Sequence, residues 1–314
     1  MTMNRLFYRL LRGSVGLISR LPFPLLYALS DVVYVVVYHL IGYRRRVVRL
    51  NLRTSFPDKS ERELRDIERH FYHFFCDYLN ETFKLLTISK EELRKHLEFR
   101  NIEQVEAYLN QGRDCAAMLG HYGNWEWLSA TSIGFQPSTQ AVTGLIYHPL
   151  YNKAFNQLFI DIRESQGGTC IPKKLILRYL ADFRRKQQHS LMGYISDQGP
   201  KWENIHLWIP FLNHETAVFT GGERIMRKMN NAVFYVDMER PCRGKYVFTF
   251  KLITDQPQAM EEHAITKRFF AMLEESVRRE PRYYLWTHNR WKRTHEEFDR
   301  RFIVENGHVL PRES

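Results

Sequence analysis

The sequence contains few cysteines and lacks the common motifs of metal and nucleophile chemistry. Its four cysteines, Cys76, Cys115, Cys170 and Cys242, include no Cys-x-x-Cys pair and lie among apolar residues. This indicates a reducing compartment, without a disulfide framework or a cysteine zinc site. No His-Glu-x-x-His or Gly-x-Ser-x-Gly segment occurs. We therefore expect no metal, no bound cofactor and no acyl-enzyme.

The chain also lacks repeats, low-complexity segments and an internal linker. Its 314 residues, of which 44% are hydrophobic and 26% charged, are enough to bury a large core, as in an ordinary globular protein. We expect two segments. Residues 1–56 form an N-terminal membrane anchor with a basic linker, and residues 57–314 form one catalytic domain. After the anchor, residues 51–57 are predicted as a linker that ends in a proline.

Acidic residues are in deficit, and the formal net charge is +11. This charge predicts an anionic partner, which is nucleic acid, anionic lipid or an acidic carrier protein. The aromatic content of 14% suits a membrane interface, although a large core is the commoner explanation. Composition alone does not choose among these partners.

The first 53 residues carry nine arginines, no lysine and a single acid, Asp31. Residues 21–43 have no basic side chain other than His39, and this run approaches the roughly 20 apolar residues that a transmembrane helix needs. Asp31 weakens the prediction, because an Asp at the bilayer centre costs about 2.5 to 3.5 kcal/mol. The run ends at three arginines, residues 44–46, which favours a membrane-embedded anchor over a cleaved signal peptide. The alternative is a buried helix with a solvated basic end.

Further along the chain, short apolar runs alternate with amphipathic segments. We predict strands at residues 97–100, 115–119, 139–147, 169–171, 190–196, 206–211, 232–238 and 246–254, and helices at 61–86, 102–111, 125–133, 151–165, 174–187, 217–229 and 260–279. Ser89 to Glu92 has the capping-box pattern of another short helix. This alternation predicts an α/β fold with a mixed, largely parallel central sheet flanked by helices, preceded by the N-terminal membrane-embedded helix.

A histidine and a carboxylate stand where the strand at 115–119 gives way to a helix. His121 follows the strand, and Glu126 comes after Gly123 and Asn124. Gly permits a turn and Asn is a favoured N-cap, so the carboxylate of Glu126 is expected to fold back and accept a hydrogen bond from one nitrogen of His121. The other nitrogen is then free to take a proton from an alcohol. The alternative is a structural histidine beside a first-turn Glu.

Asp197 follows the strand at 190–196 much as His121 follows the strand at 115–119. Ligands of open α/β sheets bind beyond the carboxyl ends of the strands. We therefore expect Asp197 and His121 to face one cleft.

Several motifs, taken in order, resemble one bacterial enzyme family. They are His121-x4-Glu126, Tyr147-His148-Pro149, Arg163 before Gly167, Asp197-Gln198, Pro210-Phe211, and residues 216–221 and 286–292. With residues 42–48 and 51–57, this set resembles the lipid A late acyltransferases, the lauroyl and myristoyl transferases, from about residue 25 to residue 293. Two positions depart from that pattern, because His148 replaces a more usual arginine and Gly199 an acidic residue.

The resemblance implies an acyltransferase on the cytoplasmic face of the bacterial inner membrane. Such an enzyme moves a fatty acyl chain from acyl carrier protein to a hydroxyl of a lipid A precursor, with coenzyme A as the alternative carrier of the donor. His121 as base and Glu126 as its partner form the implied catalytic dyad. Arg163 and Asp197 match polar positions near the dyad; the alternatives are a solvated helix arginine and a turn-forming Asp.

A basic and aromatic cluster near the C-terminus extends the membrane hypothesis. Arg290 and Lys292 alternate with Trp286 and Trp291, a mixture that suits lipid phosphates with the indoles at head-group depth. The same mixture suits nucleic acid, but no nucleic-acid motif occurs, so we expect membrane lipids and no nucleic acid as partners.

Two other functions stay open at this point. The first is an acyltransferase acting on another glycolipid or on a phospholipid, which the change at His148 leaves possible. The second is a non-catalytic, basic lipid-binding membrane protein, in which His121 and Glu126 are dispensable.

Overall fold

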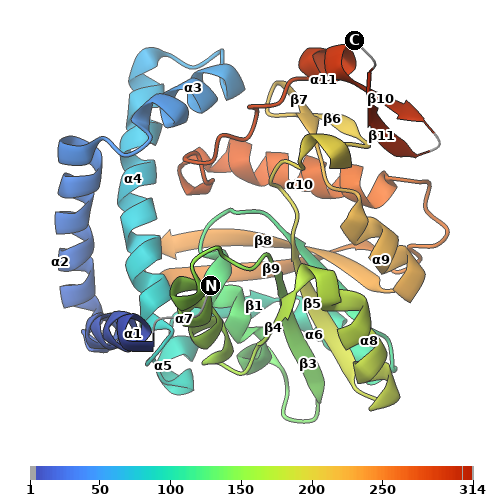
Figure 1. The fold of residues 1–314 in the computed structure, drawn as a ribbon. Helices are drawn as coiled ribbons and strands as arrows, with labels where there is room; N and C mark the ends of the chain where they lie inside the picture. Colours follow the sequence, from blue (N-terminus) through green and yellow to red (C-terminus); the bar gives the residue numbers. More distant parts are fainter. Residues whose placement is uncertain (1–4, 306, 313–314) are drawn as a thin grey trace.

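The centre of the protein is a seven-stranded sheet, shown in Figure 1. The computed structural model describes residues 5–305 and 307–312, so residues 1–4, 306 and 313–314 of the two predicted segments lie outside the description. The strand order is β1 (Leu97–Arg100), β9 (Lys245–Thr254), β8 (Ala232–Cys242), β2 (Cys115–Leu119), β5 (His189–Ile195), β3 (Ala141–Tyr147) and β4 (Thr169–Pro172). Neighbouring strands run parallel except for the β8–β9 hairpin. The predicted mixed, largely parallel α/β sheet is confirmed.

Helices follow or precede the strands of this sheet, and several of them cover its two faces. They are α4 (Glu61–Lys84), α5 (Lys90–Arg94), α6 (Ile102–Asn110), α7 (Lys153–Glu164), α8 (Ile176–Arg185), α9 (Gly221–Met229), α10 (Ala264–Arg279) and the 3-10 helices η2 (Trp125–Gly134), η3 (Lys173–Leu175), η4 (Trp202–Asn204) and η5 (Pro281–Tyr283). Leu119 of β2 shares a small cavity with η2, whereas the next residue, Gly120, lies against Leu273 of α10. Since successive residues of a strand point to opposite sides, η2 and α10 lie on opposite faces.

Local sequence signals explain where several of these elements begin. Every residue of β2 is buried, as its short apolar run predicts. The α5 helix follows Ser89, whose side chain accepts a hydrogen bond from the backbone N–H of Glu92 at 3.2 Å. The longer α4 helix begins with a complete capping box between Ser60 and Glu63.

The segment predicted as a strand at 206–211 does not join the central sheet. Its residues Trp208–Phe211 form β6, which pairs antiparallel with β7 (His214–Ala217) in a separate two-stranded sheet. Pro210 lacks the N–H that an inner strand donates, which is consistent with a place outside the main sheet. Because β7 uses residues 214–217, the helix predicted at 217–229 begins only at Gly221. The α11 helix (His295–Arg301) and the hairpin of β10 (Phe302–Glu305) and β11 (His308–Pro311) were not predicted.

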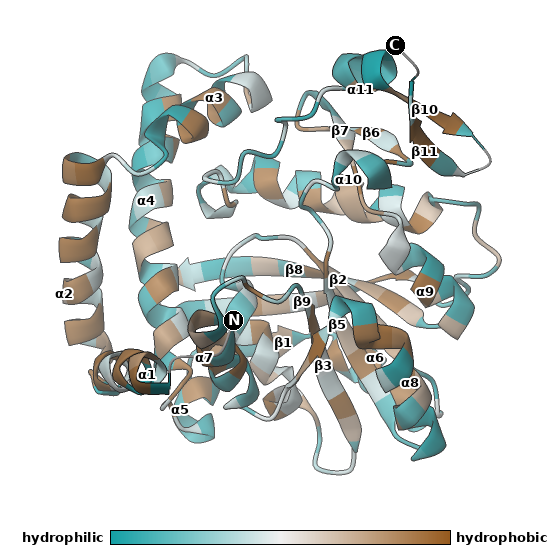
Figure 2. Cartoon of the chain, viewed as in Figure 1, coloured by the Kyte–Doolittle hydropathy of each residue, from teal (hydrophilic) through white to brown (hydrophobic). Residues whose placement is uncertain are grey.

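The N-terminal segment forms helices beside α4, as Figure 1 shows. They are α1 (Arg5–Arg20), α2 (Phe23–Tyr34), the π-helical η1 (Val35–Ile41) and α3 (Arg45–Ser55). The linker predicted at residues 51–57 is therefore wrong, because Asn51 to Ser55 belong to α3. The stretch Phe23–Ile41 is long and apolar enough to cross a membrane, and only 22% of it is buried. Figure 2 shows its apolar residues along α2.

The single acid in this apolar stretch has a cationic partner. Arg243, in the β8–β9 turn, pairs with Asp31 at 2.6 Å and also with the buried Asp77 of α4 at 2.6 Å. Asp31 therefore holds α2 to the rest of the molecule, and its charge is compensated within the fold.

Candidate active site

His121 and Asp197 meet at the carboxyl edge of the sheet. In the pairing of β2 with β5, Leu119 lies opposite Ile195, and each polar residue follows its strand by two positions. His121 Nδ1 lies 2.6 Å from Asp197 Oδ1, and the Asp197 side chain is only 2% exposed. An ionised carboxylate only accepts hydrogen bonds, so Nδ1 carries the proton and donates it to this bond. The two residues predicted to face one cleft therefore lie together at this edge, where they are hydrogen-bonded to each other.

The other imidazole nitrogen faces the amide of Gln198. The Gln198 Nε2 lies 3.1 Å from His121 Nε2, so the amide donates and the unprotonated ring nitrogen accepts. The pair of bonds sets the tautomer and the orientation of the ring. Gln198 was not singled out beforehand, although it stands in the Asp197-Gln198 motif.

Glu126 does not reach His121, and the predicted hydrogen bond between them is wrong for this structure. Its carboxylate instead forms two bonds with the guanidinium of Arg163 on α7, at 2.6 and 2.7 Å. Glu126 lies in the first turn of η2 and is buried, whereas the carboxylate that meets the imidazole comes from the neighbouring parallel strand. Burial lowers the pKa of Arg163, but the charge of Glu126 and its hydrogen bonds raise it by more. The pKa of Arg163 is therefore above its usual value.

The turn between His121 and Glu126 is held by Glu81 of α4. This buried carboxylate accepts hydrogen bonds from Asn124 Nδ2 at 2.8 Å and Tyr246 Oη at 2.5 Å. The backbone carbonyl of Glu81 accepts a third from the indole of Trp127 at 2.9 Å. Asn124 makes no side-chain cap, so the predicted N-cap is wrong and its amide serves a tertiary contact instead.

Arg290 lies beneath Asp197 rather than on the surface. It is 5% exposed, and its Nη2 donates to the Ala217 carbonyl at 2.7 Å. Burial lowers the pKa of Arg290, with Tyr284 and Asp197 opposing. Burial raises the pKa of Asp197, but its interactions with His121 and the charge of Arg290 leave it below its usual value. Asp197 therefore stays ionised.

The predicted head-group contacts of the C-terminal cluster are contradicted for Arg290 and Trp286. The Trp286 indole is fully buried and donates to the Pro281 carbonyl at 2.6 Å. Trp291 donates to Thr216 Oγ1 at 2.9 Å, and only Lys292 of the cationic pair is exposed. Because Asn51 of α3 donates to the Trp286 carbonyl at 2.9 Å, this segment joins the N-terminal helices to the site.

His288 is a further residue near the site that sequence reasoning missed. Burial lowers its pKa to about 4, with Asp197 opposing and Arg290, His121 and Lys292 adding to the decrease. It is therefore neutral near neutral pH. The signal that could have identified His288 is its place in the motif at residues 286–292.

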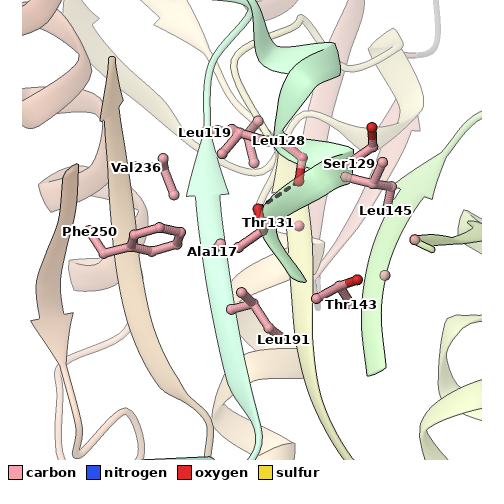
Figure 3. Close-up of a pocket in the computed structure, with 13 residues that line it drawn as sticks. Ala117, Leu119, Leu128, Ser129, Thr131, Thr143, Leu145, Leu191, Val236 and Phe250 are labelled. Carbon is pink, nitrogen blue, oxygen red and sulfur yellow. Dashed lines mark hydrogen bonds between the residues drawn. The ribbon is translucent and has the colours of Figure 1, made fainter. Parts of the chain in front are cut away.

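An apolar cavity lies between η2 and the sheet, and Figure 3 shows its lining. It is narrow, with a volume of about 20 Å³, and is lined mainly by apolar side chains and glycines, including Leu119, Leu128, Leu145, Val236 and Phe250. Leu119 is the last residue of β2 and His121 comes two residues later, so one wall of the cavity lies close to the edge of the sheet that carries His121. Its lining is apolar, but a volume of about 20 Å³ has room for little more than one water molecule.

Within residues 5–305 and 307–312, no three His, Cys, Asp or Glu residues are grouped so as to hold a metal ion.

Comparison with known proteins gives two similarities. The chain matches the family model of the bacterial lipid A biosynthesis acyltransferases over residues 6–293. It is also 22% identical over 282 residues to a lipid A biosynthesis lauroyltransferase of Escherichia coli (strain K12), an alignment that covers 89% of each chain.

Proposed function

Because the chain belongs to the bacterial lipid A biosynthesis acyltransferase family, and is therefore an acyltransferase, we propose that it transfers a fatty acyl group from acyl carrier protein to a hydroxyl of a lipid A precursor. The match over residues 6–293 carries this proposal. The polar edge at His121, the adjoining apolar cavity and the apolar N-terminal stretch support it.

His121 acts as the general base in the proposed mechanism. The acceptor hydroxyl displaces the Gln198 amide from Nε2 and gives its proton to that nitrogen while its oxygen attacks the thioester carbonyl. Asp197 holds the ring through Nδ1 and stabilises the imidazolium. As the tetrahedral intermediate collapses, the carbon–sulfur bond breaks and the thiolate takes the proton from Nε2. The acyl group moves in one transfer, without an acyl-enzyme.

Glu126 and Arg163 support the site in this mechanism. Their two hydrogen bonds connect η2 to α7 within a buried region, so the pair fixes the turn that follows His121. The dyad of the proposal is therefore His121 with Asp197, and Glu126 acts through the position of η2. This replaces the assignment of Glu126 as the partner of His121.

In this proposal the apolar cavity marks where the acyl chain enters, and it has to widen from about 20 Å³ to admit the chain. Its wall at Leu119 adjoins the edge where the thioester carbonyl has to lie for attack, and hydrocarbon enters such a cavity favourably. Closure of the site around the chain also keeps water away from the thioester.

The proposed location is the bacterial inner membrane, with the catalytic domain on the cytoplasmic face. The exposed apolar surface of Phe23–Ile41 supports contact with membrane lipids, because only 22% of that stretch is buried in the fold. Of the arginines that follow, Arg45 is paired with Glu68 at 3.0 Å, and the exposed Arg46 suits the cytoplasmic side and its anionic head groups.

Mass spectrometry of lipid extracts tests the proposal. Cells that lack the protein are complemented with the native chain or with His121→Ala. Loss of one acyl chain from lipid A, restored only by the native chain, is the expected result, and the mass difference identifies the chain. Unchanged lipid A overturns the proposed acceptor. A shift in another lipid class then indicates a different acceptor, which the unusual His148 favours, and no shift at all indicates a lipid-binding protein.

A further inference from the structure

A group of cationic side chains lies on the same sheet edge as His121, beyond β3 and β4. These strands pair in parallel with Tyr147 opposite Pro172, so the residues that follow, His148 and Lys173, emerge side by side. Lys174 is next in the chain. Strand order places β4 three strands from β2, and strands lie about 4.8 Å apart, so the group is about 14 Å from the strand that leads to His121.

The charges of Lys173 and Lys174 are not compensated by a described acidic residue. In the part of the chain that the structure describes, neither Lys173 nor Lys174 forms an ion pair or a side-chain hydrogen bond. Both are exposed, and they occupy η3, which leads directly into α8 with no acidic residue in the first turn of either helix. Cations are unfavourable at a helix N-terminus, where anions are stabilised. The lysines therefore create a positive potential without an internal counter-charge.

The electrostatics of His148 agree with this placement. Burial lowers its pKa, and Lys173, Lys201 and Lys174 lower it further. Lys201 follows β5 and also lies 4.0 Å from Glu203, so it is the partly compensated member of the group. The three lysines therefore approach His148 from two different connections at the carboxyl edge.

The connection that follows His148 exposes apolar side chains. Leu150 is 47% exposed and Tyr151 91% exposed, and Phe155 lies on the first turns of α7. The Phe155 ring contacts that of Phe7 on α1, with centroids 6.3 Å apart. An exposed apolar loop beside uncompensated lysines matches a molecule that has a phosphate next to hydrocarbon.

We propose that Lys173 and Lys174, with His148 and Lys201, form a binding site for a phosphate group of the acceptor lipid. The inference rests on the proposed function and specifies how that function selects its acceptor. A phosphate held beyond β4 leaves another part of the same molecule to reach His121.

Transfer kinetics with matched acceptors test the site. The purified full-length protein is assayed with the phosphorylated lipid A precursor and with the same lipid after phosphatase treatment. Lys173→Gln/Lys174→Gln is compared with Lys173→Arg/Lys174→Arg and with Lys228→Gln. Lys228 is an exposed lysine of α9, two residues before Asn230. The Asn230 carbonyl accepts a hydrogen bond from Arg113, which precedes β2, so Lys228 lies near the edge of the sheet opposite to His121.

The double Gln variant is expected to raise KM for the phosphorylated acceptor roughly ten- to hundredfold, with kcat and the KM for the dephosphorylated acceptor nearly unchanged. The Arg variant keeps the native KM, and Lys228→Gln changes neither constant. Equal KM changes for both acceptors, or an equal effect of Lys228→Gln, would overturn the site.

The phosphate of the donor carrier is the other possible source of the same chemistry. Replacing acyl carrier protein by an acyl N-acetylcysteamine thioester, which has no phosphate, removes that source. If the variant then loses its KM effect, the lysines bind the donor and the acceptor assignment is wrong. Absence of transfer by the native protein to either acceptor refutes the proposed function instead, so the two failures are distinguishable.

Discussion

Replacing Asp197 by Asn is the sharpest test of the proposed dyad. Asn has nearly the same shape, so the ring position is preserved, but the charge that faces His121 Nδ1 is lost. The hydrogen bond measures 2.6 Å between two groups that are 17% and 2% exposed, so little water is available to replace the carboxylate. An amide nitrogen turned toward Nδ1 also favours the wrong tautomer, with the proton on Nε2.

The expected size of the effect follows from the charge that develops on His121. Two unit charges about 4 Å apart interact by about 4 kcal/mol at an effective dielectric constant of 20. The imidazolium exists only after proton transfer, so this stabilisation belongs to the transition state and not to the resting enzyme. We expect Asp197→Asn to lower kcat roughly a thousandfold, with a much smaller change in KM.

The assay must separate catalysis from stability, because the substitution also leaves the buried Arg290 without its nearest carboxylate. Transfer is measured on the folded fraction, determined by circular dichroism at the assay temperature. Asp114→Asn is the matched control. Asp114 is also buried, and it accepts hydrogen bonds from the Ser190 backbone N–H and hydroxyl at 2.9 and 3.0 Å. Asp114 precedes β2 and Ser190 lies at the start of β5, so this pair is on the edge of the sheet opposite to His121.

A loss of less than tenfold in kcat for folded Asp197→Asn would refute the assignment of Asp197 as the partner of His121. An equal loss in Asp114→Asn would show that the rate depends on general stability. A large loss confined to Asp197→Asn agrees with the proposed dyad.

Three further predictions concern other parts of the molecule. Glu126→Gln leaves the Arg163 charge buried without its partner, so we expect the free energy of unfolding in urea to fall by about 3 to 5 kcal/mol; an unchanged midpoint contradicts a structural role for the pair. The pKa of His288 is about 4 in the folded protein and about 6.5 in the unfolded chain. Between these values the unfolded chain binds the proton and the folded protein does not, so the free energy of unfolding falls as the pH is lowered through this range. His288→Gln is expected to remove about 3 kcal/mol of this decrease, and parallel stability curves for both proteins exclude the effect. Leu40→Asp, at a position 75% exposed on η1, is expected to weaken vesicle cosedimentation roughly a hundredfold, while Leu252→Asp on β9 is without effect; equal binding by both variants contradicts contact of η1 with the bilayer.

Much of the scaffold was predictable because its signals are local. The apolar run of β2 is buried at every residue, and the serine at position 89 caps its helix as the pattern indicates. The strand at 206–211 was predicted in nearly the right place but in the wrong sheet, since an apolar run does not specify which strand it pairs with. Asn51, predicted in a linker, belongs to a helix because tertiary contacts to the Trp286 and His288 carbonyls hold it there.

The sequence by itself determined the α/β alternation and placed His121 and Asp197 each just after a strand, because periodicity and strand ends depend on neighbouring residues. Only the tertiary structure decided which carboxylate meets the imidazole. Glu126 is close in sequence but turns to Arg163, whereas Asp197, 76 residues away, is brought to Nδ1 by the parallel register of β2 and β5. A partner for a side chain is selected by geometry across the sheet, and that geometry is absent from any single stretch of sequence.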